Sequence, residues 1–376
     1  MDTITQGLLG AVTAQLGFRQ RIGRGATWAA AAAAVLPDLD IFVVPVLELT
    51  GIETDAMARH RYHRGLSHSL LMVPVLAAGV AVAWWALRRR GLARVVAGPD
   101  GRLDARAAAG RAVGGQRSPP GFGWLYACCL VAVLTHPLLD WCTSYGTQML
   151  APITDRRFAA DVVPIIDIFY TPLLVLTLLL CWVVRKVKTD PRRATLIVGW
   201  TGFLLSVGYL TAGRVMHDLA VARARELVAP GRRIVRADAY PSIGTIFLWR
   251  GVVETEDAWL AARIRPIGGR PPRHNRARKV DNAWVRRAAG LPAAGAFRWF
   301  AMGRTRPTYE KLDGRHVVEF HDMRYGLAAE DVESLWSLRV IFDADGSVRE
   351  VARTRRHRRR ELGGLIKRVW KDMWAP

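Results

Sequence analysis

The sequence is poor in cysteine and carries none in its C-terminal half. Its four cysteines all lie in or beside apolar runs: Cys128, Cys129, Cys142 and Cys181. No CxxC pair occurs, so the sequence excludes a thiolate zinc motif, and the placement excludes a disulfide framework. We expect the cysteines to pack as small apolar side chains.

Acidic residues are also scarce, with 32 Asp and Glu against 54 Lys and Arg, which gives a formal net charge of +22. Much of the excess lies in short loops between apolar runs and in the last two dozen residues. No helix-turn-helix, zinc finger or aromatic RNA-binding signature accompanies it, so nucleic acid is not expected as a partner. The distribution instead fits an integral membrane protein that obeys the positive-inside rule.

The N-terminus lacks the features of a secretory leader. Asp2 stands where a signal peptide would carry positive charge, and no small-residue cleavage site follows an apolar core, so we expect no cleaved signal. Thr3 and Gln6 instead match a capping box, which predicts a short apolar helix from about Ile4 to Phe18. That helix is too short to span and is expected to lie at the interface or to re-enter.

Apolar residues are abundant: they make up 51% of the chain, whose mean hydropathy is +0.10. They concentrate before about residue 213, where five runs are long enough to cross a bilayer. These runs are residues 26–49 (interrupted), 69–87, 121–139, 164–184 and 194–213. The fold predicted for residues 1–213 is therefore mainly α, a multi-pass helical membrane domain of about five spans plus the short N-terminal helix.

The short loops give an orientation. Arginine and lysine fill residues 19–24, 88–117 and 185–193, which places these three loops in the cytoplasm. The alternate loops, about 50–68 and 141–163, then face outward. With five spans the C-terminal domain is expected to be extracytoplasmic, because long domains translocate largely regardless of their charge.

The segment 214–352 is predicted to be a small, β-rich α+β soluble domain. Residues alternate between polar and apolar at Thr245–Trp249 and Leu338–Phe342, and Asp343–Gly346 predicts a hairpin turn after the second stretch. The segment 353–376 reads as a basic amphipathic tail, either a helix on an anionic membrane surface or a solvated run of charge.

His136 and Asp140 lie one helical turn apart in the third apolar run and therefore share a helix face. Ionisable groups at membrane depth are costly and point to a functional site. An imidazole with a carboxylate suits Zn²⁺, Fe²⁺ or Mn²⁺. Alternatively, Asp140 does not bind the ion but forms a hydrogen bond to a ligand histidine and fixes its tautomer.

Asp38 and Asp40 follow an alanine-rich run, and Pro37 between them and that run removes a backbone donor. Each aspartate costs roughly 2.5 to 3.5 kcal/mol at the centre of a spanning helix, so something must compensate. One alternative is that the span ends at Leu36 and leaves two solvated carboxylates. The apolar run resumes at Ile41–Leu47, which favours metal ligation.

His63 and His68 are five residues apart, so a turn at Gly65 is needed for both to bind one ion. Ser67 is expected to be a hydrogen-bonding neighbour or a helix cap. A lone histidine is usually structural or solvated, but a pair ahead of an apolar span favours ligands. The loop charges place all three clusters on the outward side, which favours one shared site.

Asp167 lies within a further apolar run, Ile165–Leu180, on the same outward side. It is a candidate for a further ligand or a general base, and with Asp140 it forms the predicted catalytic pair. The polar loop Thr143–Gln148 offers donors for a substrate anion, although a plain turn explains it equally well.

Three motifs together resemble the signatures of the YdjM/YbcI family of bacterial inner-membrane proteins, which are classed as metal-dependent hydrolases. They are Leu36-Pro37-Asp38-Leu39-Asp40, His63-Arg64-Gly65-Leu66-Ser67-His68-Ser69, and Thr135-His136-Pro137-Leu138-Leu139-Asp140 with Tyr145-Gly146-Thr147. The resemblance covers about residues 1–180. Many members have Thr-His where this chain has Thr5-Gln6, so its site has one histidine fewer or that position is not a ligand. A fainter likeness to zinc-dependent phospholipase C enzymes implies phosphoester chemistry.

These observations predict a membrane-embedded metallohydrolase that acts on an ester or phosphoester of a lipid or envelope substrate at the outer face of the cytoplasmic membrane. One or two divalent ions would be held by Asp38, Asp40, His63, His68, His136 and Asp140, with zinc favoured and manganese or iron as alternatives. The competing hypothesis is a non-catalytic, metal-stabilised membrane protein or an ion carrier with an interaction domain. A carrier pairs ionisable residues near mid-membrane, whereas these cluster toward one face.

Overall fold

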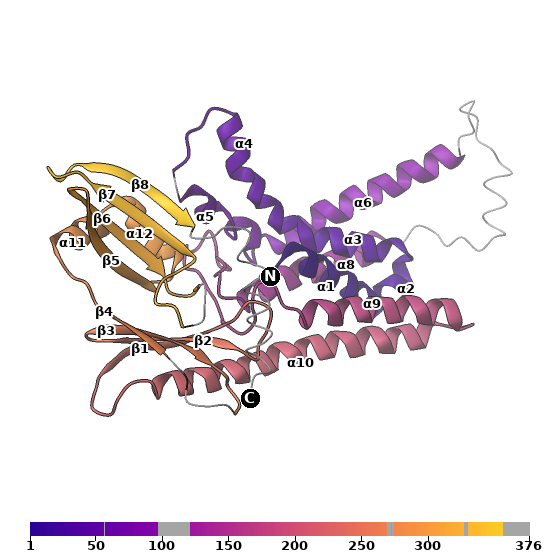
Figure 1. The fold of residues 1–376 in the computed structure, drawn as a ribbon. Helices are drawn as coiled ribbons and strands as arrows, with labels where there is room; N and C mark the ends of the chain where they lie inside the picture. The colour runs from indigo at the N-terminus through magenta and orange to yellow at the C-terminus, as the bar shows by residue number, and fades with distance from the viewer. Residues whose placement is uncertain (56, 97–120, 269–271, 273, 327–329, 356–376) are drawn as a thin grey trace.

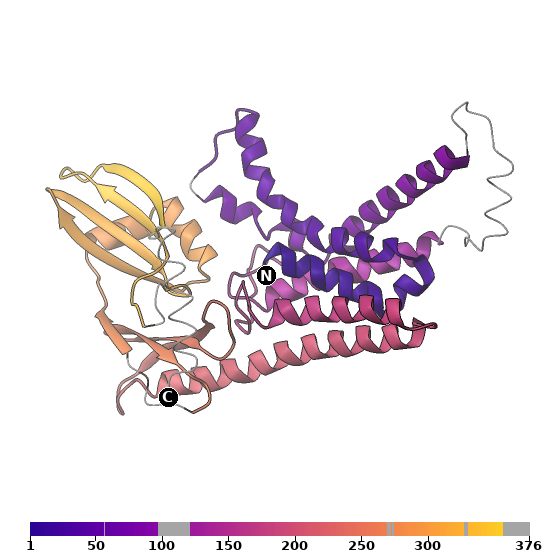
Figure 2. The ribbon, with the colours of Figure 1, turned by 45° about the vertical axis from the view of Figure 1, so that its right-hand side comes forward.

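The computed structural model describes residues 1–55, 57–96, 121–268, 272, 274–326 and 330–355. Figure 1 shows a bundle of elongated helices with two β-sheets at one of its ends. The predicted fold class, a helical membrane domain followed by a β-rich domain, is confirmed. Figure 2 shows the same arrangement after rotation, with α9 and α10 side by side.

The first part contains α1 (Thr3–Thr13), η1 (Ala14–Leu16), α2 (Phe18–Ile22), α3 (Gly25–Val35), η2 (Leu36–Phe42), α4 (Val43–Leu49), α5 (Ala58–Tyr62), η3 (Leu66–His68), α6 (Val73–Val96), α8 (Phe122–Trp141), α9 (Tyr170–Val187) and α10 (Arg192–Arg225). Among the described residues, four segments are long and apolar enough to cross a membrane: Gly25–Leu49, α8, α9 and α10. A fifth span forms if Ala58–His68 and Val73–Arg89, bent by 75°, are one broken span. The five expected runs correspond to these segments.

The N-terminal helix differs from its prediction in cap, length and environment. Asp2, not Thr3, caps α1, because its carboxylate accepts a hydrogen bond from the Thr5 backbone N–H at 3.0 Å. The helix ends at Thr13, and it packs inside the bundle against α3, α8 and α9. Gly10 permits the contact with α3, since an added Cβ would lie 2.6 Å from the carbonyl oxygen of Ala30.

α10 is the longest helix and joins the two parts. It continues beyond the expected domain boundary at residue 213 and ends at Arg225. Its C-terminal portion packs against β1, β2 and β3. Leu9 of α1, Ala220 of α10 and Trp249 of the first sheet belong to one buried apolar cluster. The helices and the first sheet therefore share a hydrophobic core.

The second part contains two four-stranded antiparallel sheets, in the orders β1-β2-β3-β4 and β5-β6-β7-β8. Their elements are β1 (Ile234–Pro241), β2 (Trp249–Thr255), β3 (Ala258–Ile264), β4 (His274–Arg278), α11 (Ala283–Ala289), α12 (Pro292–Phe300), β5 (Thr305–Leu312), β6 (Arg315–Asp322), β7 (Trp336–Phe342) and β8 (Val348–Arg355). Apolar side chains of α11 and α12 pack with those of β6 and β7 in one core.

The predicted hairpin at Asp343–Gly346 is confirmed, because it joins β7 to β8. The predicted strand at Thr245–Trp249 is wrong, and only Trp249 begins a strand. The backbone there bonds locally: the Phe247 N–H donates to Thr245 Oγ1 at 3.0 Å, and the Trp249 indole donates to the Ile246 carbonyl at 2.7 Å. Of the expected basic tail, residues 353–355 end β8, and residues 356–376 lie outside the described residues.

The cysteines pack as predicted. All four are free thiols, with Cys128, Cys129 and Cys181 buried and Cys142 partly buried. Cys128 and Cys129 belong to the apolar cluster that joins α3, α6 and α8.

Candidate metal centre

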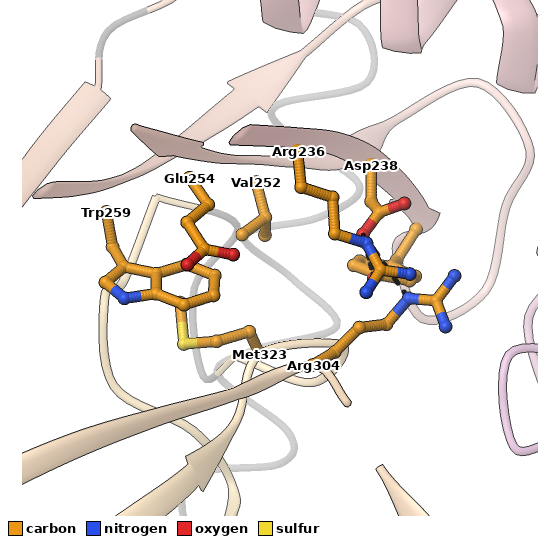
Figure 3. Close-up of a pocket in the computed structure, with 8 residues that line it drawn as sticks. Arg236, Asp238, Val252, Glu254, Trp259, Arg304 and Met323 are labelled. Atoms are coloured by element: carbon orange, nitrogen blue, oxygen red, sulfur yellow. Dashed lines mark hydrogen bonds and ion pairs between the residues drawn. The ribbon is translucent and has the colours of Figure 1, made fainter. Parts of the chain in front are cut away.

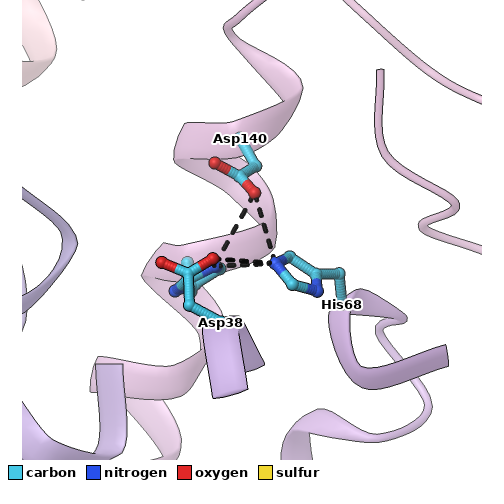
Figure 4. Close-up of side chains that lie close together, drawn as sticks. Asp38, His68 and Asp140 are labelled. Atoms are coloured by element: carbon cyan, nitrogen blue, oxygen red, sulfur yellow. Dashed lines mark hydrogen bonds and ion pairs between the residues drawn. The ribbon is translucent and has the colours of Figure 1, made fainter. Parts of the chain in front are cut away.

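Four of the predicted site residues converge at the end of the bundle that faces the sheets. Asp38, His68, His136 and Asp140 each offer one ligand atom, and these four atoms lie within 4.8 Å of one another. All four residues are buried, and they come from η2, η3 and α8. Figure 4 shows the carboxylates of Asp38 and Asp140 directed toward the His68 imidazole.

Pro37 sets the positions of the two aspartates of η2. It stands in the first turn of a seven-residue 3₁₀-helix, where residues two apart point in directions about 120° from each other. Asp38 Oδ1 consequently lies 3.5 Å from both His68 Nε2 and His136 Nε2. Asp40 Oδ2 instead lies 3.2 Å from His68 Nδ1, on the opposite edge of that ring.

The α8 pair meets as its spacing predicts. α8 continues through Pro137 to Trp141, and His136 Nε2 lies 3.6 Å from Asp140 Oδ2. His136 Nδ1 lies 2.5 Å from the carbonyl oxygen of Ala34, the residue before the end of α3. Because a carbonyl oxygen only accepts, the ring carries its proton on Nδ1 and presents a lone pair at Nε2.

His68 is oriented in the same sense. Ser67 Oγ donates to Asp40 Oδ2 at 2.7 Å and lies 2.9 Å from His68 Nδ1, so it accepts the proton of that nitrogen. The Nε2 atoms of His68 and His136 then face each other across 3.0 Å. When both rings are neutral, each of these atoms carries a lone pair, and a cation between them and the two carboxylates would be stabilised.

The separations fit one tetrahedral ion. In a zinc site with bonds of about 2.1 Å, neighbouring ligand atoms lie about 3.4 Å apart. Five separations among these four atoms run from 3.0 to 3.6 Å. Asp140 Oδ2 is also buried without a hydrogen bond, and its charged neighbour is the Arg64 guanidinium at 3.0 Å. The donor set and its spacing therefore suit a divalent metal.

Comparison with known proteins supports the order and spacing of these motifs. The family model described as YdjM inner membrane protein matches residues 1–217, which include all four converging residues. The chain belongs to this family. No curated protein and no solved structure matches it. The family description specifies a membrane location and no reaction.

In this YdjM family member, several polar groups around the cluster escaped sequence reasoning. Arg64 Nε lies 3.0 Å from Asp140 Oδ2, and the Met1 amino group also pairs with Asp140. Gln6 donates to Asp140 Oδ1 at 2.9 Å, and Thr3 donates to Asp38 Oδ2 at 2.6 Å. Arg64 lies in the motif His63–Ser69, and an arginine close to apolar spans was the signal in the sequence that could have identified it as a site residue.

Gln6 thus reaches the site at the position where the family resemblance implied a histidine. Its amide nitrogen holds Asp140, while its buried oxygen has no hydrogen-bond partner. Position 6 therefore belongs to the site, but in this chain its side chain holds a ligand by a hydrogen bond and is not itself a metal ligand.

Asp40 and His63 were predicted as ligands but stand beside the four-residue cluster. His63 Nδ1 lies 2.7 Å from Asp40 Oδ1, and Asp40 contacts the outer nitrogen of His68. A carboxylate behind a ligand histidine orients the ring and raises its basicity. The neighbour role predicted for Ser67 is confirmed by its bond to the same carboxylate.

Asp167 is not brought into the cluster. Its Oδ1 accepts the backbone N–H groups of Phe169 and Tyr170, both at 2.8 Å, at the start of α9. Tyr209 of α10 also donates to it at 2.9 Å. Asp167 thus accepts two backbone N–H groups ahead of α9 and ties this helix to α10.

Proposed function

We propose that this protein is a membrane-embedded metal-dependent hydrolase. The observation that carries the proposal is the convergence of the Nε2 atoms of His68 and His136, 3.0 Å apart, with the carboxylates of Asp38 and Asp140. Such a set binds Zn²⁺, with Mn²⁺ and Fe²⁺ as alternatives. A bound divalent ion supplies a Lewis acid that lowers the pKa of water and polarises an ester or phosphoester oxygen.

The chain's own residues hold the ligands in place. Asp40 and the Ala34 carbonyl fix the two imidazoles, Thr3 holds Asp38, and Arg64 with Gln6 holds Asp140. Ligands fixed in this way need little rearrangement when an ion binds, which favours a defined coordination geometry.

A lipid or envelope substrate is favoured by the side chains around the cluster. Ile4, Leu39 and Leu66 are each next in sequence to a residue of the hydrogen-bonded site, and all are at least half exposed. Asp38 is the least buried ligand, with 8% of its side chain accessible, and it is held by the exposed Thr3. In a bilayer these apolar side chains would face lipid, so we propose access at the outer face from the lipid phase.

One observation favours the second candidate, a metal-stabilised protein without catalysis. Four protein ligands complete a tetrahedral zinc site, as in structural centres, whereas catalytic zinc keeps a position open. Six-coordinate Mn²⁺ or Fe²⁺ would leave positions for water and substrate with the same four ligands. The identity of the ion therefore bears on the function.

The test compares detergent-purified wild type with His68→Ala and His136→Ala, and uses Asp167→Ala as the matched control. Metal content is measured by mass spectrometry, and hydrolysis is measured on a chromogenic phosphodiester, a chromogenic ester and phosphatidylglycerol micelles. We expect one ion per chain, lost in both histidine variants and retained in the control. The histidine variants should be inactive, and wild type stripped by a chelator should regain activity when Zn²⁺ or Mn²⁺ is added.

Stoichiometric metal that survives both histidine substitutions would rule out the shared centre. Metal without turnover of any of the three substrates would favour the structural role.

A further inference from the structure

A second cavity lies between the membrane helices and the sheets, beside the loop that follows α8. It is half open to solvent and has a volume of about 640 Å³, within the range of small-molecule sites. Trp141 at the end of α8 and the segment 156–159 form one wall. Arg236 of β1 and the region from Gly295 in α12 to Arg304 form the other.

Five arginines line this cavity, and no acidic residue does: Arg156, Arg157, Arg236, Arg298 and Arg304. Arg236 and Arg304 share the carboxylate of Asp238, at 2.7 and 3.3 Å. Figure 3 shows this trio in a neighbouring cavity of about 10 Å³, which has room for about one water. The larger cavity is therefore the one that can hold a ligand.

The other three arginines have no neutralising carboxylate among the described residues. Within the described part of the chain, no ion pair includes Arg156, Arg157 or Arg298. Asp161 lies 3.9 Å from Arg304 and is the only further acid paired with a lining arginine in that part. Five guanidinium groups against two carboxylates leave three positive charges around one cavity.

Arg157 is the cation whose burial costs the most free energy, because only 5% of its surface is exposed. Its Nη atoms donate to the carbonyl oxygens of His60 and Gly146 at 3.1 and 2.7 Å, and its Nε has no partner. Burial lowers the pKa of this guanidinium to about 10, so it stays charged at neutral pH. A buried cation without a counter-ion is destabilising unless an anion binds beside it.

Two tryptophans, Trp141 and Trp299, also line the cavity, and Trp141 indicates where the cavity lies relative to the membrane surface. Trp141 immediately follows the metal-site residue Asp140, at the end of a membrane span. Trp299 lines the cavity, and its indole N–H donates to the Asp155 carbonyl at 3.1 Å, which joins the two walls. Tryptophan at the end of a span marks the headgroup level of a bilayer.

We propose that this cavity binds a phosphate-bearing anion at the membrane surface. Guanidinium groups match phosphate oxygens in pairs, and several around one cavity suit a group of charge −1 or −2. The phosphate can belong to an anionic lipid headgroup or to a soluble molecule. The site is separate from the metal centre, because none of the four residues that converge there lines the cavity.

The test is calorimetric titration of the full chain in a neutral detergent. One probe is inorganic phosphate, and the other is dihexanoyl phosphatidylglycerol below its micelle concentration. Arg156→Gln/Arg298→Gln removes two exposed lining charges without touching the buried Arg157. Arg315→Gln is the matched control: it is a half-exposed arginine of the same domain, about 23 Å along β5 from the cavity.

We expect the double variant to bind the preferred probe about a hundredfold more weakly, roughly tenfold for each arginine, and the control to match the wild type within about twofold. Tighter binding of phosphatidylglycerol would identify a lipid headgroup, and tighter binding of inorganic phosphate a soluble ligand. Equal affinity of wild type and double variant, or no binding of either probe by the wild type, overturns the proposal.

Discussion

Arg324 Nη1 donates a hydrogen bond to the carbonyl oxygen of Ser144 at 2.9 Å, so a side chain that follows β6 holds the loop that follows the metal-site helix. The same guanidinium also donates to the Tyr145 carbonyl and pairs with Asp322 Oδ2 at 2.6 Å, with both side chains fully buried. The C-terminal domain is therefore bonded directly to the membrane domain next to the candidate site.

Arg324→Met should destabilise the protein by about 3 to 5 kcal/mol, because it leaves the buried Asp322 carboxylate without a partner. Asp322→Asn/Arg324→Met should cost less, since it removes the stranded charge. Thermal unfolding in detergent measures both. If the single and double variants melt together, the loss of stability does not come from an unpaired Asp322 carboxylate.

Asp40→Ala should weaken metal binding by about 10- to 100-fold, because the carboxylate orients His68 from behind. Asp38→Ala should weaken it further, because Asp38 faces the ion directly. Metal affinity is measured by competition with a calibrated chelator, with exposed Asp218→Ala as the control. An equal loss of metal affinity in the two variants would indicate that Asp40 is also a metal ligand.

Asp167→Ala should keep its metal and lose about 1 kcal/mol of stability, because it removes hydrogen bonds to the start of α9 and to Tyr209. Metal analysis and the melting temperature check the two parts separately. Abolished hydrolysis in a variant with full metal content and a near-normal melting temperature would instead support the general base predicted from the sequence.

Gly10→Ala should separate α1 from α3 and lower the melting temperature, because the new methyl group would lie 2.5 Å from Ala34 Cβ and 2.6 Å from a backbone oxygen. Overpacking of this kind costs about 1 to 3 kcal/mol. Gly79→Ala in α6 is the matched control, because nothing lies within 4 Å of its added Cβ. A Gly10→Ala protein as stable as the control would contradict the close packing.

The C-terminal domain should face away from the cytoplasm, as the loop charges predict. Arg315→Cys places a thiol on its exposed surface, whereas the native cysteines are buried or partly buried. In intact cells with a permeable outer envelope, an impermeant maleimide should label this cysteine. The same reagent should label Arg193→Cys, in the basic first turn of α10, only after lysis. The reverse pattern would invert the topology.

Sequence reasoning located the spans and most of the centre because both depend on local signals. Apolar length predicted the helices, and the four-residue spacing of His136 and Asp140 predicted a shared face. The roles of Asp38 and Asp40 could not be separated in this way. Which of them faces the ion depends on the 3₁₀ geometry that Pro37 imposes, since an α-helix would place residues two apart at a different angle.

Contacts between distant segments also escaped prediction. The burial of α1 depends on glycine contacts with α3, and the bond from Arg324 to Ser144 joins residues 180 positions apart. The arginines of the second cavity come from three separate parts of the chain. In the sequence they are indistinguishable from an ordinary surplus of positive charge.

The continuity of α10 has a mechanical consequence. Its 34 residues extend about 51 Å, whereas the hydrocarbon core of a bilayer is about 30 Å thick, so the helix acts as a rigid strut that sets how far the first sheet stands from the lipid. A helix adapts to a thinner or thicker bilayer mainly by tilting. Since α10 and the first sheet share one hydrophobic core, the sheet and the arginine-lined cavity beside it would tilt together. A change in bilayer thickness would thereby change the orientation of the domain outside the membrane.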